Sequence, residues 1–245
     1  MPFRISAVLS PAEPVPPAPA ALVVDVIRAT TTAAYLLDAG ARELWLTGSL
    51  EGARALAERQ GALLAGERGG LPPEGFDLGN SPREVRPERV RGRGVVMTTT
   101  NGTRAALRAA EAVPEVALAA LVNAGAAVLW AAGRGDGVAL VAAGREGRVA
   151  LDDAYTLGAL VTGLRARVPE AELDDGARLA EALFLAQPDA RSALAASAAA
   201  RALEPVGLAA DVEVCARADA LAVLPVLAER GDGALRFAPV YPKGV

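Results

Sequence analysis

The amino-acid sequence predicts an α/β fold of three α/β/α layers with a mainly parallel sheet. Short apolar runs alternate with stretches of helical spacing along most of the chain. Twice, an apolar run leads into a loop of threonines that is followed by a helix, once within residues 21–48 and again within residues 94–122. We therefore expect a single domain over residues 1–245 that contains an internal pseudo-repeat of strand, loop and helix.

The first half of the chain supplies the elements around the first threonine loop. Besides the strand before this loop, residue patterns predict strands at residues 3–8, 43–46 and 62–65 and helices at residues 31–38 and 50–60. The proline-rich residues 11–19 cannot donate ladder hydrogen bonds and are expected to form a connector. Glycine and proline are frequent from residue 66 to residue 87, which predicts a long loop.

The second half repeats the order and ends in alanine-rich helices. Strands are expected at residues 94–97, 116–119 and 138–142, and helices at residues 104–112, 123–132, 152–164 and within 174–203. Alternating β-branched residues predict two further strands in the tail, at residues 212–215 and 221–224.

The composition excludes several kinds of chemistry. Histidine is absent, so histidine relays and histidine-ligated metals are excluded, and the single Cys215 excludes an internal disulfide or a cysteine cluster. Carboxylates, hydroxyls, arginines and a hard cation bound through oxygen remain. A net charge of −4 with 4% aromatic residues argues against nucleic-acid binding. Without a long apolar stretch or a basic-then-apolar leader, we expect a cytoplasmic protein with no membrane partner.

The two threonine loops predict an anion site. Ligands of parallel sheets bind at the carboxyl ends of strands, where helix N-termini offer unpaired N–H groups. The groups that we expect to contact an anion are Arg28, Thr30 and Thr31 in the first loop and Thr99, Thr100, Asn101, Thr103 and the following Arg104 in the second. A structural alternative stays open, because a threonine side chain also caps a helix N-terminus.

Carboxylates near these loops predict a cation site. Asp25 lies in an otherwise apolar strand, so its carboxylate needs a partner, either Arg28 or a metal ion. Asp152 and Asp153 stand in the first turn of a helix, where the helix dipole alone already favours them. Two carboxylates about 4 Å apart repel by roughly 4 kcal/mol at an effective dielectric of 20, a cost that a divalent cation would remove. Arg145, in a glycine-rich turn before this helix, is a further candidate for anion binding.

Several motifs in one order resemble a known family. They are residues 25–32, the Gly66-Glu67-Arg68 element that leads to residues 75–82, residues 98–103 and residues 144–153, followed by Gly207, Asp211, Cys215, Asp219 and Pro225. Across essentially the whole chain, they resemble the 2-phosphosulfolactate phosphatase (ComB) family. Asp152-Asp153 stands where that family tends to have Glu-Asp, and residues 142–144 lack a cysteine that the family would have there.

The resemblance implies magnesium-dependent hydrolysis of the phosphate monoester of a small 2-hydroxy acid. In the family, the substrate is 2-phosphosulfolactate, which yields sulfolactate and phosphate in coenzyme M synthesis. The implied Mg²⁺ ligands are among Asp25, Glu67, Asp77, Asp152 and Asp153. The implied catalytic residues are Asp25, Arg28 and Asp153, and Arg68, Asn80, Ser81 and Arg145 join the threonine loops as substrate-binding residues.

Two alternative functions stay open. One is a phosphatase for a different 2-phospho acid, and the other is a non-catalytic protein that binds a small anionic metabolite. Retention of acidic residues beside the threonine loops favours an enzyme, since a binding protein would not need them. A homo-oligomer is also compatible with the sequence.

Overall fold

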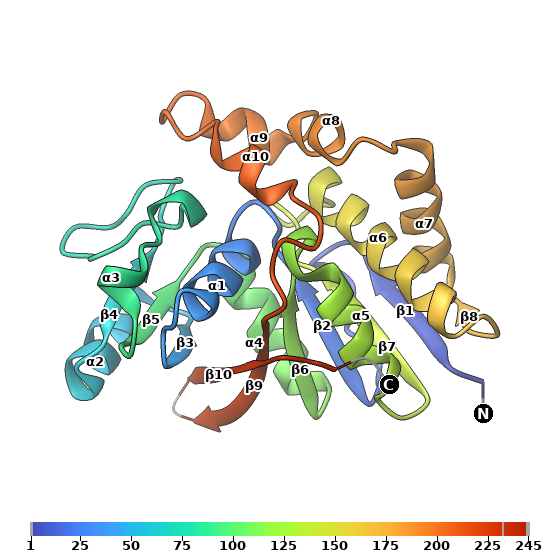
Figure 1. The fold of residues 1–245 in the computed structure, drawn as a ribbon, viewed down its shortest axis with the longest axis horizontal. Helices are drawn as coiled ribbons and strands as arrows, with labels where there is room; N and C mark the ends of the chain where they lie inside the picture. Colours follow the sequence, from blue (N-terminus) through green and yellow to red (C-terminus); the bar gives the residue numbers. More distant parts are fainter. Residues whose placement is uncertain (1, 232, 244–245) are drawn as a thin grey trace.

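A ten-stranded sheet runs through the part of the protein that the structure describes (Figure 1). The structure is a computed structural model and describes residues 2–231 and 233–243. The strand order is β4-β5-β3-β10-β9-β6-β2-β7-β1-β8, and helices pack against both faces, so the fold is the expected three-layer α/β/α arrangement.

The strands are β1 Arg4–Val8, β2 Ala20–Val24, β3 Glu43–Thr47, β4 Leu63–Gly66, β5 Gly94–Thr98, β6 Glu115–Ala119, β7 Gly137–Ala142, β8 Glu172–Leu173, β9 Leu224–Gly231 and β10 Ala234–Val240. The helices are α1 Ala29–Asp38, α2 Leu50–Gln60, α3 Pro87–Val90, α4 Gly102–Ala112, α5 Ala124–Ala132, α6 Leu151–Arg167, α7 Asp175–Ala186, α8 Ala190–Ala195, α9 Ala198–Leu203 and α10 Asp211–Cys215. Short 3-10 turns lie at Pro82–Glu84 and Leu121–Asn123.

The sheet consists of two parallel groups of strands. One group is β4, β5 and β3, and the other is β6, β2, β7, β1 and β8. The β9–β10 hairpin joins them through antiparallel pairs only, and β6 meets β9 at the single pair of Ala117 and Val226. The pairs β3–β10, β10–β9 and β9–β6 are each antiparallel, so the strand direction reverses three times between the two groups. The strands of one group therefore run in the opposite direction to those of the other.

The two threonine loops belong to chain segments that cross between these groups. The first loop and α1 lead from β2 to β3, whereas the second loop and α4 lead from β5 back to β6. Both segments are therefore a strand, a loop, a helix and a strand. Their loops meet at the centre, where a Cβ atom on Gly102 would lie 2.7 Å from Asp25 Oδ2.

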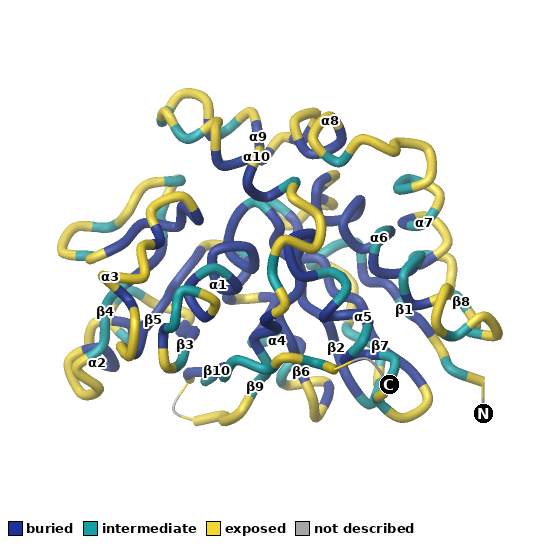
Figure 2. Tube along the Cα trace, in the orientation of Figure 1, coloured by how far each residue is buried: buried dark blue, intermediate teal, exposed yellow. Residues whose placement is uncertain are grey.

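The core follows from the apolar strands in the middle of the sheet. Every residue of β2 and β7 is buried, as expected for central strands covered by helices on both sides. Figure 2 shows these strands in dark blue, while exposed residues lie on the outer helices and loops. Small residues let helices approach closely, and a Cβ on Gly158 of α6 would lie only 2.1 Å from the carbonyl oxygen of Ala180 in α7.

Most predicted elements are confirmed, but the C-terminal tail is different. Residues 212–215 form helix α10 rather than a strand, and the strand expected at 221–224 begins only at Leu224 as β9. The prediction missed the short β8 and the strand β10. In α10, Val212 and Val214 are buried and Asp211 is bound to two distant loops, so tertiary contacts override the β-branched pattern. No helix in the described part of the chain is long and apolar enough to cross a membrane.

Candidate active site

A cleft of about 530 Å³ lies where the two threonine loops meet. Its polar lining consists of Asp25, Arg28, Glu67, Asn80, Thr100, Asn101, Arg104, Arg145 and Glu146. Helix α9 supplies Ala199, Ala202 and Leu203 as an apolar wall, and α8 to α10 extend along one side of the molecule in Figure 1. The cleft is thus surrounded by residues that lie far apart in the sequence. Most of its polar residues are among the predicted substrate and metal ligands.

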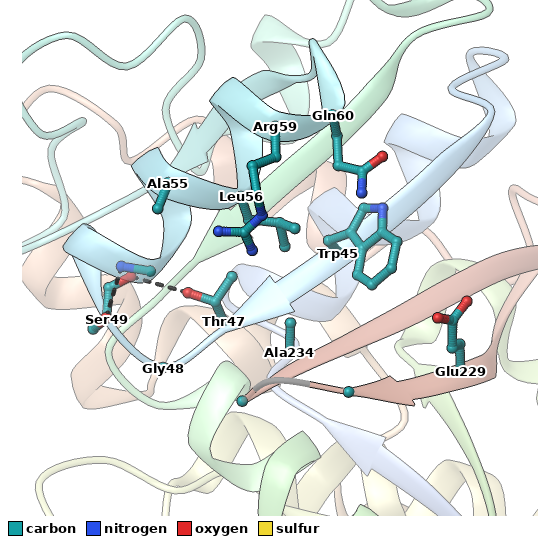
Figure 3. Close-up of a pocket in the computed structure, with 13 residues that line it drawn as sticks. Trp45, Thr47, Gly48, Ser49, Ala55, Leu56, Arg59, Gln60, Glu229 and Ala234 are labelled. Carbon is teal, nitrogen blue, oxygen red and sulfur yellow. Dashed lines mark hydrogen bonds between the residues drawn. The ribbon is translucent and has the colours of Figure 1, made fainter.

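A second cavity of about 620 Å³ lies between α2 and the β9–β10 hairpin (Figure 3). Its lining includes Trp45, Leu56, Arg59 and Glu229. Thr47 and Ser49 at its rim are hydrogen-bonded to one another through the Thr47 hydroxyl. It contains none of the predicted site residues, so the chemistry points to the cleft at the threonine loops.

Asp25 follows β2 and places a buried carboxylate on the cleft wall. Its side chain is 8% exposed, and Oδ1 accepts a hydrogen bond of 3.3 Å from the amide of Ala29 at the start of α1. Burial raises the pKa of Asp25 to about 6; the Ala29 amide opposes this shift, and the charge of Glu67 adds to it. The carboxylate is thus poorly solvated and lies near a second acid.

Arg28 is held from two sides. Its Nη1 donates to Asp211 Oδ2 at 2.8 Å, and its Nη2 donates to the carbonyl oxygen of Gly70 at 2.7 Å. The ion pair that the sequence suggested between Arg28 and Asp25 is therefore replaced by one between Arg28 and Asp211. A guanidinium has five N–H donors, so Arg28 keeps further donors on its cleft side.

The threonine hydroxyls of the first loop are bonded within the protein. Thr30 Oγ1 bonds to the backbone N–H and C=O of Asp25, Thr31 Oγ1 donates to the Val26 carbonyl at 2.7 Å, and Thr32 Oγ1 donates to the Asn80 carbonyl at 3.0 Å. Neither Thr30 nor Thr31 lines the cleft, and α1 has no side-chain cap. None of these hydroxyls caps α1, and they brace the loop, while ligand contact by Thr30 and Thr31 stays a prediction.

In the second loop, the roles divide between neighbours. Thr99 and Thr103 are buried, and each side-chain oxygen accepts a hydrogen bond from the other residue's amide, at 3.0 and 3.2 Å. Thr100 and Asn101 line the cleft. Gly102 is required here because a Cβ would meet Asp25 Oδ2 and Ala29 Cβ, both at 2.7 Å. Of the predicted second-loop residues, Thr100 and Asn101 lie at the cleft, and their contact with a ligand stays a prediction.

Glu67 ties the second loop to the turn at residues 67–70. Its Oε1 accepts from the Thr100 amide at 2.8 Å and its Oε2 from the Gly70 amide at 2.9 Å. Burial by itself would raise the pKa of Glu67, but hydrogen bonds from Gly70 and Thr100 outweigh it, so the pKa lies below its usual value. Glu67 therefore stays ionised at neutral pH, at the cleft and close to Asp25.

Asp153 joins the first loop to the loop after β7. Its Oδ1 accepts from the Val26 amide at 3.0 Å and its Oδ2 from the Gly144 amide at 2.9 Å. Burial raises the pKa of Asp153 well above its usual range, and the charges of Asp152 and Asp25 add to this. Because both oxygens accept from amides, the side chain acts as a brace behind the cleft wall.

Asp152 differs from its neighbour in having an unsatisfied oxygen. The residue is 2% exposed, and its Oδ1 has no hydrogen-bond partner. Burial raises the pKa of Asp152 to about 7, with a further contribution from Asp25, while Arg145 opposes the shift. A buried acceptor without a partner costs free energy. Asp152 therefore has a free acceptor near Asp25 that a proton or a cation would satisfy.

Three predicted residues lie elsewhere or are otherwise engaged. Asp77 is exposed beside β4, where its Oδ2 accepts from the Leu64 amide at 2.8 Å, and it does not line the cleft. Arg68 donates to the backbone and side-chain oxygens of Thr98. Ser81 donates to Asp211 Oδ1 at 2.7 Å. By contrast, Asn80 and Arg145 do line the cleft, and Asn80 Oδ1 lacks a hydrogen-bond partner.

Two further residues belong to the surroundings of the cleft. Arg104, which the sequence places with Asn101 in the predicted anion site, lines the cleft from the first turn of α4. Asp211 is fully buried and bonds Arg28 and Ser81. No spacing rule connects residues 28, 81 and 211, so only the folded chain reveals this cluster.

Metal coordination is not preformed in the described residues. Within residues 2–231 and 233–243, no group of three or more Asp, Glu or Cys side chains is arranged to hold a metal ion. Asp25, Asp152 and Asp153 nevertheless influence one another's charge, so they are close to each other. The arrangement supplies few carboxylate oxygens and a larger number of N–H donors, which is a composition suited to an anion.

Comparisons with known proteins identify the family of this chain. The model of the 2-phosphosulpholactate phosphatase family matches residues 9–230. A Thermus thermophilus protein named as a probable 2-phosphosulfolactate phosphatase is 53% identical over 217 residues, which cover 88% of this chain and 91% of that protein. A Deinococcus radiodurans protein of the same name is 49% identical over 222 residues, covering 89% and 92% of the two chains. This chain therefore belongs to the 2-phosphosulfolactate phosphatase family.

Proposed function

We propose that this chain is a phosphatase that hydrolyses 2-phosphosulfolactate to sulfolactate and phosphate, with Mg²⁺ as its cofactor. Family membership and the names of the similar proteins support the reaction class and the substrate. The observation that carries the proposal is the cleft, in which the buried Asp25 and Arg28 face the polar end of the second threonine loop. With this substrate, the chain would act in coenzyme M synthesis.

The arginines of the cleft match the charges of such a substrate. It carries a phosphoryl group, a carboxylate and a sulfonate, and the cleft is lined by Arg28, Arg104 and Arg145. We assign the phosphoryl group to the buried Arg28 together with Thr100 and Asn101, since each charge-assisted hydrogen bond contributes about 1.5 to 3 kcal/mol. Arg104 and Arg145 would then hold the carboxylate and the sulfonate.

In the hydrolysis itself, a water oxygen forms a bond to phosphorus while the bond from phosphorus to the ester oxygen breaks. The ester oxygen takes up a proton and becomes the hydroxyl of sulfolactate. Asp25 lines the cleft, and we assign to its carboxylate the role of accepting a hydrogen bond from the attacking water. Arg28 would stabilise charge on the phosphoryl oxygens, and Asp153 would fix the loop that carries both residues.

The carboxylates near the cleft fit Mg²⁺ in their chemistry. Mg²⁺ is usually held by one or two carboxylates, with water and substrate phosphate completing its coordination. Asp152 has a buried oxygen without a partner, and its pKa and that of Asp25 are raised, so a cation would satisfy this oxygen and offset the charge of both carboxylates. Asp25 and Asp152 would hold the ion, which would polarise the phosphoryl oxygens. Asp153 and Glu67 are less suited, because backbone amides bind both of their carboxylate oxygens.

The proposal is tested by phosphate release from a panel of 2-phospho acids, with and without Mg²⁺. We expect the highest kcat/KM for 2-phosphosulfolactate, a lower value for phospholactate and phosphoglycolate, and loss of activity after chelation. A higher kcat/KM for another acid of the panel would mean that the substrate is a different 2-phospho acid. Full activity after exhaustive chelation would refute the magnesium requirement, and calorimetric binding of sulfolactate without any phosphate release would indicate a binding protein.

A further inference from the structure

Asp211 connects three segments of the site from behind the cleft wall. It is fully buried at the first position of α10 and does not line the cleft. Its Oδ2 accepts from Arg28 Nη1 at 2.8 Å, and its Oδ1 accepts from Ser81 Oγ at 2.7 Å. We propose that Asp211 is a positioning residue that aims the Arg28 guanidinium at the phosphoryl site, an inference that rests on the proposed function.

The contacts fix the plane of the Arg28 side chain. Asp211 binds Nη1 while the Gly70 carbonyl oxygen binds Nη2 at 2.7 Å, so both terminal nitrogens have a partner of fixed position. A planar guanidinium anchored at two points has little freedom to rotate. Its remaining N–H donors are therefore directed before a ligand arrives, which removes the entropy loss of ordering a flexible side chain on binding.

Asp211 is also connected to the cleft indirectly, because it binds Ser81, the neighbour of Asn80. Ser81 follows Asn80, whose side chain lines the cleft, and the Asn80 carbonyl accepts from Thr32 Oγ1 at 3.0 Å. The carboxylate of Asp211 thereby holds the first threonine loop and the Asn80–Ser81 turn in one relative position. Both of its oxygens are engaged, and neither is exposed to a ligand.

The charge of Asp211 and its positioning role predict opposite effects on phosphate binding. A negative charge next to an anion site repels the anion, so removing it would by Coulomb's law alone tighten phosphate binding. If positioning of Arg28 dominates, removing the charge weakens phosphate binding, because a neutral side chain holds the guanidinium less firmly. The sign of the change therefore decides between the two roles.

The experiment measures the Kd of inorganic phosphate by calorimetry for the parent protein, for three single variants, and for Arg28→Lys with and without Asp211→Asn. We expect Asp211→Asn to weaken phosphate binding by about tenfold and Ser81→Ala by about threefold. Glu181→Gln is the matched control, since it neutralises the acid of the Arg165–Glu181 ion pair, also at 2.8 Å but away from the cleft, and it should leave Kd unchanged. In the Arg28→Lys background, Asp211→Asn should have no further effect on Kd.

Unchanged or tighter phosphate binding by folded Asp211→Asn would overturn the proposal, as would an equal loss in the Arg28→Lys background. If circular dichroism shows that Asp211→Asn does not fold, Ser81→Ala decides, and an unaltered Kd in that variant then overturns the proposal. Phosphate binding requires no turnover. A parent protein that binds phosphate but hydrolyses no 2-phospho acid would therefore refute the proposed function and leave the test of Asp211 intact.

Discussion

The two threonine loops share a composition but present different groups to the cleft. In the first loop, the hydroxyls of Thr30 and Thr31 bind the loop backbone, and the ionised side chains beside them, Asp25 and Arg28, face the cleft. In the second loop, Thr99 and Thr103 bind each other, and Thr100 and Asn101 face the cleft with neutral groups. One loop therefore supplies charge, and the other supplies neutral hydrogen-bonding groups.

The difference shows what a run of threonines does at the end of a buried strand. Each loop must leave the sheet and enter a helix within a few residues, which exposes backbone groups to a low-dielectric interior. Threonine hydroxyls satisfy those groups locally, and their β-branched side chains restrict the loop to one shape. These hydroxyls thus hold the loop backbone in place, and with it the residues that line the cleft, which are Asp25 and Arg28 in the first loop and Thr100 and Asn101 in the second.

Replacing one cleft-lining polar side chain in each loop should have unequal effects on catalysis. Asp25→Asn keeps the shape but removes the charge, and we expect kcat to fall by about a hundredfold or more. Asn101→Ala removes a neutral donor, so we expect phosphate affinity to weaken by about 1 kcal/mol while kcat changes little. Steady-state kinetics and calorimetry with phosphate measure the two effects. Equal losses of kcat in both variants would contradict the division between charged and neutral loops.

The pH dependence of stability should arise from the buried carboxylates around the first loop, those of Asp25, Asp152 and Asp153. The pKa of Asp25 is about 6 and that of Asp152 about 7, both above the unfolded value of 3.8, so the folded state binds more protons between these limits. The free energy of unfolding should therefore decrease as pH rises from about 4 to 7, by roughly 3 kcal/mol for Asp25. The lowered pKa of Glu67 makes the free energy of unfolding increase with pH instead, but this effect occurs below pH 4.5.

Urea unfolding at pH 5 and pH 8 in the presence of a chelator measures the change in the free energy of unfolding with pH. We expect Asp25→Asn to flatten it and Asn101→Ala to leave it unchanged, since the second loop contains no acid with a raised pKa. Added Mg²⁺ should also flatten it if the cation takes the place of the bound proton. If the free energy of unfolding of the metal-free protein increases from pH 5 to pH 8, the buried carboxylates do not have raised pKa values.

The sequence was most informative where local pattern decides structure. Strand and helix periodicity predicted β2, α2 and β7, and residues of both threonine loops line one cleft. Resemblance supplied Glu67 and Asn80, which no spacing rule would select. Whether a side chain faces a ligand or its own backbone depends on tertiary contacts, so Thr31 and Arg68 were assigned to the substrate although their polar groups bind Val26 and Thr98.

The contact between the loops can be broken at Gly102. A methyl group there would approach Asp25 Oδ2 and Ala29 Cβ at 2.7 Å, and neither is the end of a flexible side chain. We expect Gly102→Ala to destabilise the protein by about 1 to 3 kcal/mol and to lower kcat, because the loops are forced apart. Gly48→Ala is the control, since its nearest contact is the Leu107 methyl group at 3.4 Å. Thermal unfolding with unchanged Tm in Gly102→Ala would mean that the loops separate freely.

The smallest expected effects distinguish a bracing hydroxyl from one that faces the cleft. Thr31→Val keeps the shape but leaves the buried Val26 carbonyl without its 2.7 Å hydrogen bond, so the free energy of unfolding should fall by about 1 kcal/mol while phosphate Kd stays constant. Thr100→Val keeps the amide that binds Glu67, so stability should change by less than about 0.5 kcal/mol while phosphate binding weakens about twofold to threefold. Urea unfolding and calorimetry on the same samples separate the two quantities. If Thr31→Val instead weakens phosphate binding at unchanged stability, the Thr31 hydroxyl contacts the ligand, and the first loop binds the anion through its threonines as well as through Arg28.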